Sequence, residues 1–330
     1  MKHCALVTLI TFAVLFTGVV SCNAPHVRGP LPTPARVANL TPVAPPSLAD
    51  TLPRDYPGLH NNVSYHEGFV SGSVPEGDAG FDTLAAMGVK TIISVDGMTP
   101  DVERARERGI RYIHLPIGYN GFSNARRLEL TRATRDALVD GPVFIHCHHG
   151  KHRSAGAAAA VAVGLGWMNA DESVARMKVS GTAPNYTGLY ACAANATLVG
   201  AGALDAVHGN FPEVSKPAGL VQGMLDIDEA FENLKAIEKA GWAVPTDHPD
   251  LVPVAEAGRL AETYRTLAAL PSIAQRSAEF VAMLRDANAK GQALEEMLAA
   301  GGADNEKLTA GLKEIGETCK ACHSVYRDKP

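Results

Sequence analysis

The pattern of hydrophobic and polar positions divides the chain into two unlike segments. Between residues 58 and 207, short apolar, β-branched runs alternate with stretches of helical period. The strand-like runs are VKTIISV (89–95), RYIHLPI (111–117) and GPVFIHC (141–147). Helices are expected over 78–87, 100–108, 123–139, 169–179 and 188–198, and over the small-residue stretch SAGAAAAVAVGLGWM. This alternation favours an α/β domain whose central, mostly parallel sheet is flanked by helices.

The second segment has helical periodicity only. HGNFPEVSKP (208–217) interrupts the pattern with glycine and two prolines and indicates a linker. Within 218–330, helical patterns cover 220–240, 251–269, 272–298 and 306–327, with short breaks between them. This spacing is typical of an all-α four-helix bundle.

The first 57 residues fit neither domain. Residues 1–22 have a basic start, an apolar run and small residues before Cys22, which predicts a signal peptide and resembles the bacterial lipobox. The alternative is a plain signal peptide cut near Ala24, although Pro25 would then follow the cut. Residues 23–57 are rich in proline and should form an extended tether. We therefore expect a periplasmic or cell-envelope protein, lipid-anchored through Cys22 and touching the membrane through that lipid alone.

Composition narrows the function classes. The chain has 330 residues and a formal net charge of −5, so it lacks the basic excess usual in nucleic-acid-binding proteins, and no nucleic-acid partner is expected. Six scattered cysteines are too few for a disulfide framework. The cysteines that carry chemistry should therefore lie in two short motifs.

The first motif is HCHHGKHRS (146–154), between an expected buried strand and an expected helix. A loop at a helix N-terminus directs backbone N–H groups at one point, and such a point binds oxyanions. Arg153 can hold two phosphate oxygens with its planar guanidinium, and the same positive field favours the thiolate of Cys147. The motif thus predicts an attacking sulfur beside a seat for a phosphoryl group.

These residues resemble the cysteine-dependent tyrosine and dual-specificity phosphatases, whose signature is HCxxGxxR followed by Ser or Thr. A weaker resemblance extends over residues 63–200. It implies that Cys147 is the nucleophile that forms a phosphocysteine, that Arg153 binds phosphate, that Ser154 assists departure of the thiolate, and that His146 orients the loop.

One part of the family pattern is missing. Members usually carry an aspartate general acid after the strand that here ends YIHLP, but this chain continues IGYNGFS. Asp96 is the nearest substitute and Asp101 a weaker one. Catalysis is therefore expected to be slow or limited to good leaving groups.

The remaining loop residues bear on the substrate. They are candidate substrate-binding groups: His148, His149, Gly150, Lys151 and His152. So basic a loop is similar to family members that act on multiply phosphorylated inositols or lipids, while a phosphoprotein substrate stays open. Two alternatives are that these side chains point to solvent, or that Cys147 is a structural thiol beside histidines that bind a metal adventitiously.

The second motif is CKACH (319–323), the CxxCH attachment signal of c-type haem. Cys319 and Cys322 would bind one haem covalently, and His323 would be an axial ligand of the iron. A redox CxxC or half a zinc site would not need the histidine. Over 217–330 the segment resembles the cytochrome c′ and c556 class, which implies a distal residue on the first helix, for which Met224 is the candidate.

Together the motifs predict an exported phosphomonoester hydrolase fused to a haem module for redox or gas sensing or for electron transfer. Its expected partners are a phosphorylated substrate and a redox partner. The alternative is a c-type cytochrome whose phosphatase-like domain only binds phosphorylated ligands. Intact Cys147, Arg153 and Ser154 favour the enzyme, and the missing aspartate favours the alternative.

Overall fold

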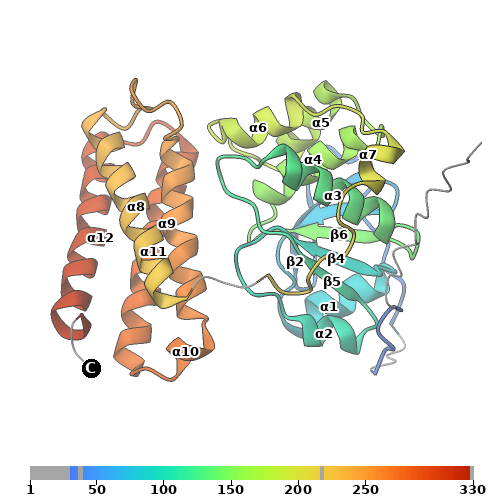
Figure 1. Cartoon of the computed structure of the whole chain (residues 1–330), viewed down its shortest axis with the longest axis horizontal. Coiled ribbons are helices and arrows are strands. Elements are labelled where there is room, and N and C mark those ends of the chain that lie inside the picture. Colours follow the sequence, from blue (N-terminus) through green and yellow to red (C-terminus); the bar gives the residue numbers. More distant parts are fainter. Residues whose placement is uncertain (1–29, 36–39, 216–218, 328–330) are drawn as a thin grey trace, which may run out of the picture.

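The computed structural model describes residues 30–35, 40–215 and 219–327, which form an α/β domain and a helical bundle (Figure 1). The expected signal peptide and its Cys22 lie outside the described residues. Across the part of the chain that the structure describes, no helix combines the length and apolar character needed to span a membrane.

A mixed sheet forms the centre of the N-terminal domain, and in the described residues it has six strands in the order β1-β2-β3-β6-β4-β5. The strands are β1 (Arg54–Tyr56), β2 (Leu59–His66), β3 (Phe69–Gly72), β4 (Thr91–Ser94), β5 (Arg111–His114) and β6 (Val143–His146). β3, β6, β4 and β5 are parallel, while β1 and β2 form an antiparallel edge. The register pairs His146 with both Gly72 and Ser94. The carboxyl ends of these strands therefore meet at one edge, the usual position of ligand sites in such sheets.

Helices cover both faces of this sheet, as the sequence pattern predicted. On one face lie α1 (Gly77–Ala86) and α2 (Val102–Glu107), and on the other lie α3 (Asn124–Ala137), α4 (Arg153–Gly164), α5 (Ala170–Val179), α6 (Thr187–Ala194) and α7 (Ala201–Asp205). Side chains of β6 alternate between two cores: Phe144 packs into the core of α1 and α2, and Val143 and Ile145 pack into the other. Every residue of α4 is buried, which explains its small side chains.

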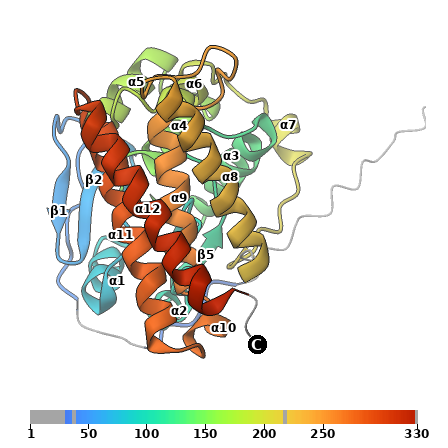
Figure 2. The same ribbon diagram turned by 90° about the vertical axis from the view of Figure 1, so that its left-hand side faces the viewer.

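The C-terminal domain is a bundle of four long helices, and this confirms the predicted fold class. They are α8 (Leu220–Lys239), α9 (Pro253–Ala268), α11 (Ala278–Ala300) and α12 (Asn305–Tyr326). Figure 2 shows α12 on the outside of the bundle, whereas α9 lies on the side that faces the α/β domain. The single helix expected over 272–298 was wrong: α10 (Pro271–Ala274) is separate, and Ser277 caps a new helix by accepting from the Phe280 N–H at 3.2 Å.

Residues 40–57 were expected to belong to the extended tether, but they pack on the N-terminal domain. β1 pairs with β2, and the Val43 N–H donates to the Ala86 carbonyl at 3.1 Å. Arg176 donates to the carbonyl of Asp50 at 2.7 Å. The proline-rich composition does not prevent this packing, because proline keeps its carbonyl acceptor. Residues 40–57 therefore belong to the N-terminal domain, whose expected start was residue 58.

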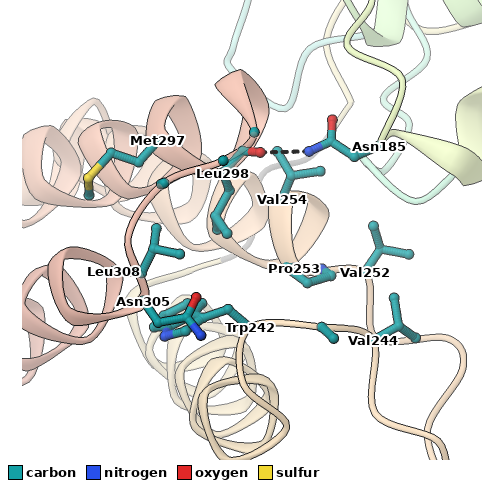
Figure 3. A pocket seen from close by; sticks show the side chains of 14 residues that line it. Asn185, Trp242, Val244, Val252, Pro253, Val254, Met297, Leu298, Asn305 and Leu308 are labelled. Carbon is teal, nitrogen blue, oxygen red and sulfur yellow. Dashed lines mark hydrogen bonds between the residues drawn. The ribbon is translucent and has the colours of Figure 1, made fainter.

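A cavity of about 370 Å³ lies where one end of the bundle meets the α/β domain (Figure 3). Its walls are mainly apolar and include Trp242, Val254 and Leu308. Asn185 crosses from the N-terminal domain and donates to the Leu298 carbonyl at 2.7 Å. The cavity is thus a feature of the contact between the domains.

Candidate functional site

The loop after β6 is fixed tightly against the neighbouring strands. Gly150 has φ +74°, and a Cβ at this position would lie 2.4 Å from the carbonyl carbon of Gly72. The side-chain amide of Asn61 donates to the carbonyls of Gly150 at 2.9 Å and Ser180 at 2.8 Å. The Val74 N–H donates to the carbonyl of His148 at 3.1 Å. The loop geometry therefore requires glycine at 150 and depends on the β2–β3 edge.

Cys147 is buried at the start of this loop, with 3% of its surface exposed. The hydroxyl of Ser154 lies 3.3 Å from its Sγ, close enough to donate a hydrogen bond to a thiolate. Ser154 belongs to the first turn of α4, so Cys147 lies near the positive end of that helix. The structure therefore brings together the proposed nucleophile and the residue expected to stabilise its departure.

His146 precedes the cysteine and is buried among polar partners. Its Nδ1 lies 3.2 Å from the carbonyl oxygen of Cys147, and its Nε2 lies 2.7 Å from the Tyr112 hydroxyl. Because a carbonyl can only accept, we assign the ring proton to Nδ1, and Nε2 accepts from Tyr112. Burial lowers the pKa of His146 to about 4, so it is neutral at pH 7. His146 therefore positions the loop.

Arg153 is the largest fully buried side chain among the described residues. Its guanidinium lies over the Tyr119 ring at 4.1 Å, and Nη2 donates to the Tyr119 hydroxyl at 3.0 Å. Nη1 donates to Oε1 of Glu262, a residue of α9 in the bundle. Nη2 also lies 3.8 Å from Asp96 Oδ1. The guanidinium expected to bind phosphate is therefore paired with carboxylates of this chain.

Asp96 follows β4 and lies close to Arg153. Burial alone would raise the pKa of Asp96, but the guanidinium groups of Arg153 and Arg265 hold it well below its ordinary value. Arg265 Nη2 donates to Asp96 Oδ1 at 2.7 Å, and the Met98 N–H donates to the same oxygen at 3.0 Å. In this arrangement Asp96 is an ionised counter-charge, so it has no proton to donate.

The histidines of the loop add less positive charge than the sequence suggests. Burial lowers the pKa values of His148 and His152 to about 3, and it also lowers that of His149. His152 stacks on Tyr186 with ring centroids 4.1 Å apart, and the rings of His148 and His149 are 4.4 Å apart. At neutral pH these rings are polar groups, and the formal charge of the loop belongs to Lys151, which is exposed, and to Arg153.

A metal-binding role for these histidines has no support in the described part of the chain. There, no group of three or more His, Cys, Asp or Glu side chains is arranged to hold a metal ion.

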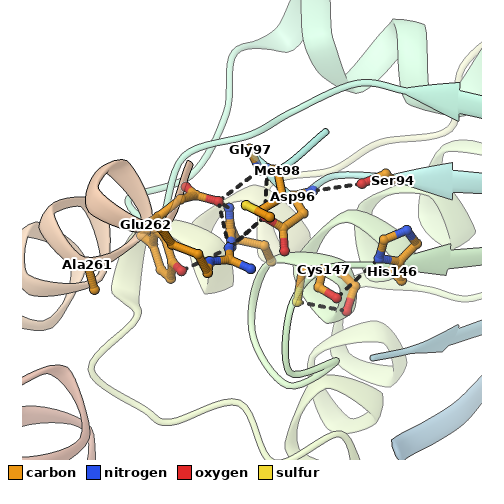
Figure 4. Close-up of polar contacts among 12 residues, drawn as sticks. Ser94, Asp96, Gly97, Met98, His146, Cys147, Ala261 and Glu262 are labelled. Carbon is orange, nitrogen blue, oxygen red and sulfur yellow. Dashed lines mark hydrogen bonds and ion pairs between the residues drawn. The ribbon is translucent and has the colours of Figure 1, made fainter. Parts of the chain in front are cut away.

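Two residues of this site come from the bundle and were not predicted. Figure 4 shows Glu262 extending from α9 toward Asp96 and Gly97, with Cys147 and His146 beyond them. Glu262 Oε1 also accepts from the Gly97 N–H at 2.8 Å, and Arg265 is the second residue. Their spacing of i and i+3 places both on one face of α9. Sequence patterns could indicate that face but not the domain it contacts.

The haem motif lies on the last two turns of α12. Cys319, Cys322 and His323 have the spacing i, i+3 and i+4, which places them on one face of the helix. The two cysteines are half-buried against the bundle core and His323 is exposed. The Tyr264 hydroxyl lies 3.2 Å from Cys319 Sγ. Both thiols are free, as attachment of a haem requires.

Met224 lies on α8 at the level of this motif. α8 and α12 run in opposite directions, and Phe231 meets Gly316, where a Cβ would lie 3.0 Å from the ring. Met224 lies two turns before Phe231 on α8, and His323 lies two turns after Gly316 on α12. Because the helices are antiparallel, Met224 and His323 lie at the same level of the bundle. The nearby apolar side chains Val221 and Leu225 are 77% and 59% exposed. A flat apolar macrocycle beside the cysteines would cover such surface, so the residues present fit a haem.

Comparison with known proteins finds one family model and several solved structures that are similar to parts of this chain. Residues 208–327 match the family model described as Cytochrome C′. A structure of TpbA from P. aeruginosa in complex with pTyr has TM-score 0.35 and 19% identity, covering 45% of this chain and 99% of that one. A putative phosphatase (DUF442) from Shewanella putrefaciens CN-32 has TM-score 0.34 and 19% identity, covering 42% and 95%. Human DUSP28 has TM-score 0.33 and 20% identity, covering 42% and 93%. No curated protein matches the chain.

Proposed function

We propose that the N-terminal domain is a phosphomonoester hydrolase that acts through a phosphocysteine on Cys147. The observation that carries the proposal is the placement of Cys147, Arg153 and Ser154 around one loop at the carboxyl end of β6. A thiolate there faces the N-terminus of α4, where backbone N–H groups and Arg153 would hold phosphate oxygens.

The chemistry follows from these positions. The Cys147 sulfur attacks phosphorus, an S–P bond forms, and the P–O bond to the leaving group breaks. A water oxygen then attacks phosphorus and the S–P bond breaks, which releases inorganic phosphate and restores the thiolate that Ser154 stabilises. In this arrangement the arginines hold the pKa of Asp96 well below its ordinary value, so Asp96 is not an acid for the leaving oxygen, and aryl phosphates should react faster than alkyl phosphates.

Hydrolysis of an aryl phosphate by the purified protein tests this function. Cys147→Ser should abolish turnover, because a serine hydroxyl is not ionised at neutral pH. Arg153→Lys should be severely impaired, because an ammonium cannot hold two oxygens side by side. Cys192→Ser is the matched control, since Cys192 contacts the backbone of Phe122 on another loop. Turnover in Cys147→Ser equal to that of the wild type would refute the proposal.

The natural substrate is a phosphorylated molecule, either a phosphoprotein or a phosphorylated inositol or inositol lipid. The neutral histidines weaken the charge argument for highly phosphorylated inositols, because Lys151 and Arg153 carry the loop's formal charge. Competition of the aryl phosphate assay by phosphotyrosyl peptides and by inositol phosphates would separate the two classes.

The C-terminal domain binds one covalent c-type haem and exchanges electrons with a redox partner or senses redox state or gas. When bound, the haem supplies one-electron or ligand-binding chemistry. Cys319 and Cys322 would hold it through thioether bonds, His323 would provide an imidazole ligand, and Met224 is the candidate for a second ligand. Haem should survive acid-acetone extraction and be lost from the Cys319→Ala, Cys322→Ala double variant. An unchanged visible spectrum in Met224→Leu would exclude the methionine as a ligand.

The chain is exported and lipid-anchored through Cys22, facing the periplasm, where c-type haem is attached. Cys22→Ala should move the protein from the membrane fraction to the soluble periplasmic fraction. Wild-type protein recovered in the cytoplasm would contradict this localisation.

A second function is a c-type cytochrome whose phosphatase-like domain only binds phosphorylated ligands. The ionised state of Asp96 favours it, because that aspartate cannot donate a proton. Tight binding of phosphotyrosine without detectable hydrolysis of any phosphate ester would establish this alternative.

A further inference from the structure

The phosphate-binding guanidinium is occupied by a side chain of the bundle. Arg153 donates to Glu262 Oε1, and the Gly97 N–H donates to the same oxygen at 2.8 Å. A carboxylate oxygen that accepts from a guanidinium makes the contacts that a phosphate oxygen would make. Glu262 is largely buried, with 15% of its side chain exposed. An oxyanion in the cradle would therefore compete with Glu262 for Arg153.

A second ion pair joins the same two domains, with its cation on the bundle and its anion on the α/β domain. The α/β domain contributes Arg153 and Asp96, and α9 contributes Glu262 and Arg265. Arg265 Nη2 lies 2.7 Å from Asp96 and 3.4 Å from Glu262 Oε1. The formal charges of the two arginines and the two carboxylates sum to zero, although burial raises the pKa of Glu262. Removing one partner would leave an unpaired buried charge. The charges on the two domain surfaces are therefore complementary, and these ion pairs are buried, unlike exposed surface ion pairs, which contribute little.

The shape of the contact is also specific. A Cβ on Gly97 would lie 2.9 Å from the Glu262 carboxylate carbon, so an alanine there would push the carboxylate away from this backbone N–H. Two further bonds tie the same faces together. Tyr186 donates to Glu295 of α11 at 2.6 Å, and the Asn120 side chain donates to the Asp250 carbonyl at 2.7 Å. These contacts hold the bundle over the cradle in one specific docked arrangement.

We propose that α9 is an autoinhibitory latch in which Glu262 occupies the place of the substrate phosphate and Arg265 holds the counter-charge Asp96. The proposal rests on the proposed phosphatase function, because it names the regulation of that site. Substrate binding requires the latch to open. The apparent affinity for any oxyanion is therefore the affinity of the open state multiplied by the fraction of molecules that are open. Opening frees Arg153 and Asp96 together, since Glu262 and Arg265 move with one helix.

Binding of tungstate, an inorganic oxyanion that needs no turnover, tests the latch in the full-length, haem-loaded protein. Glu262→Ala should bind tungstate about tenfold or more tightly than the wild type in calorimetry, as expected when an open state of a tenth or less becomes the major one. The KM for an aryl phosphate should fall by a similar factor. Glu262→Gln retains the shape of the side chain without its charge and should shift affinity in the same direction.

Glu256→Gln is the matched control. Glu256 is a buried carboxylate on the same helix, but it accepts from Asn233 within the bundle at 2.9 Å. Its tungstate affinity should equal that of the wild type. Circular dichroism establishes that each variant is folded before binding is measured.

The outcomes separate the latch from the enzyme. Tighter tungstate binding by both Glu262 variants without hydrolysis by any protein would support the latch and refute the phosphatase. Equal binding by the wild type and both variants would overturn the latch while leaving hydrolysis intact. Unchanged tungstate binding with a lower kcat in Glu262→Ala would also overturn it, and would make Glu262 a catalytic residue. Failure of every protein to bind tungstate would remove the anion site and the latch with it.

Discussion

Replacing Gly150 by alanine would test how tightly the loop between β6 and α4 is fixed to β3. At φ +74° an alanine costs roughly 1–2 kcal/mol, because its Cβ crowds the following carbonyl. The added carbon would also lie 2.4 Å from the Gly72 carbonyl carbon and 2.5 Å from the Ser73 nitrogen. These contacts are about 1 Å closer than nonbonded carbon atoms ordinarily approach, and both neighbours are backbone atoms of the sheet edge.

The loop must therefore move away from β3, and overpacking of this kind costs roughly 1–3 kcal/mol more. Gly150→Ala should lose about 2–5 kcal/mol of unfolding free energy in urea and should bind tungstate weakly or not at all. Gly88→Ala is the control, because Gly88 has φ +78° and nothing within 4 Å of the added carbon. It should lose only about 1–2 kcal/mol and bind tungstate normally. Equal losses in the two variants, with normal tungstate binding by both, would refute the contact between the loop and β3.

Three further perturbations address the same domain and its contact with the bundle. Burial lowers the pKa of His146 from 6.5 to about 4, so between these pH values the unfolded chain binds a proton that the native protein does not. The free energy of unfolding should therefore fall by roughly 3 kcal/mol as the pH drops from 6.5 to 4. In urea unfolding, the stability of His146→Gln should depend less steeply on pH than that of the wild type. Burial raises the pKa of Glu295, so the stability that this group contributes is fully present below about pH 4.5 and declines as the pH rises through the raised pKa. Glu295→Gln should therefore gain stability relative to the wild type between about pH 4 and 7. Parallel profiles of stability against pH for the two proteins would contradict this. Asn61→Ala should cost roughly 2–4 kcal/mol in urea unfolding, because two buried carbonyls lose their donor, and an unchanged unfolding midpoint would contradict that role.

The sequence predicted the strands β6, β4 and β5 because they lie in mainly apolar runs. β4, β5 and β6 lie within 89–95, 111–117 and 141–147. The first three strands, β1, β2 and β3, were missed for a physical reason. Asn62, Ser64 and Ser71 are buried there, at 0%, 4% and 0% exposure, so neither an apolar run nor a regular alternation marks these strands.

The motif residues around the thiol could be identified because they are close together in the sequence. Cys147, Arg153 and Ser154 fall within eight positions of one strand–loop–helix segment, where local geometry decides their neighbours. The pairing of Arg153 with Glu262 crosses 109 positions and depends on how two domains dock. The ionised state of Asp96 depends on the same docking, since Arg265 comes from α9. A linear pattern contains no information on that contact.

The placement of α9 couples the loop of Arg153 to the motif of Cys319, because this helix contacts both. Glu262 and Tyr264 are about 200° apart around this helix, so one side pairs with Arg153 while the other lies 3.2 Å from Cys319. A displacement of α9 relative to α12 that frees the guanidinium would also move the Tyr264 hydroxyl relative to the Cys319 thiol. Equilibrium linkage is reciprocal: an oxyanion that favours the displaced helix changes the environment of the cysteines, and any change at the cysteines that favours the displaced helix raises the affinity for the oxyanion. One turn of α9 thus contacts both sites, through the Glu262 carboxylate at Arg153 and through the Tyr264 hydroxyl at Cys319.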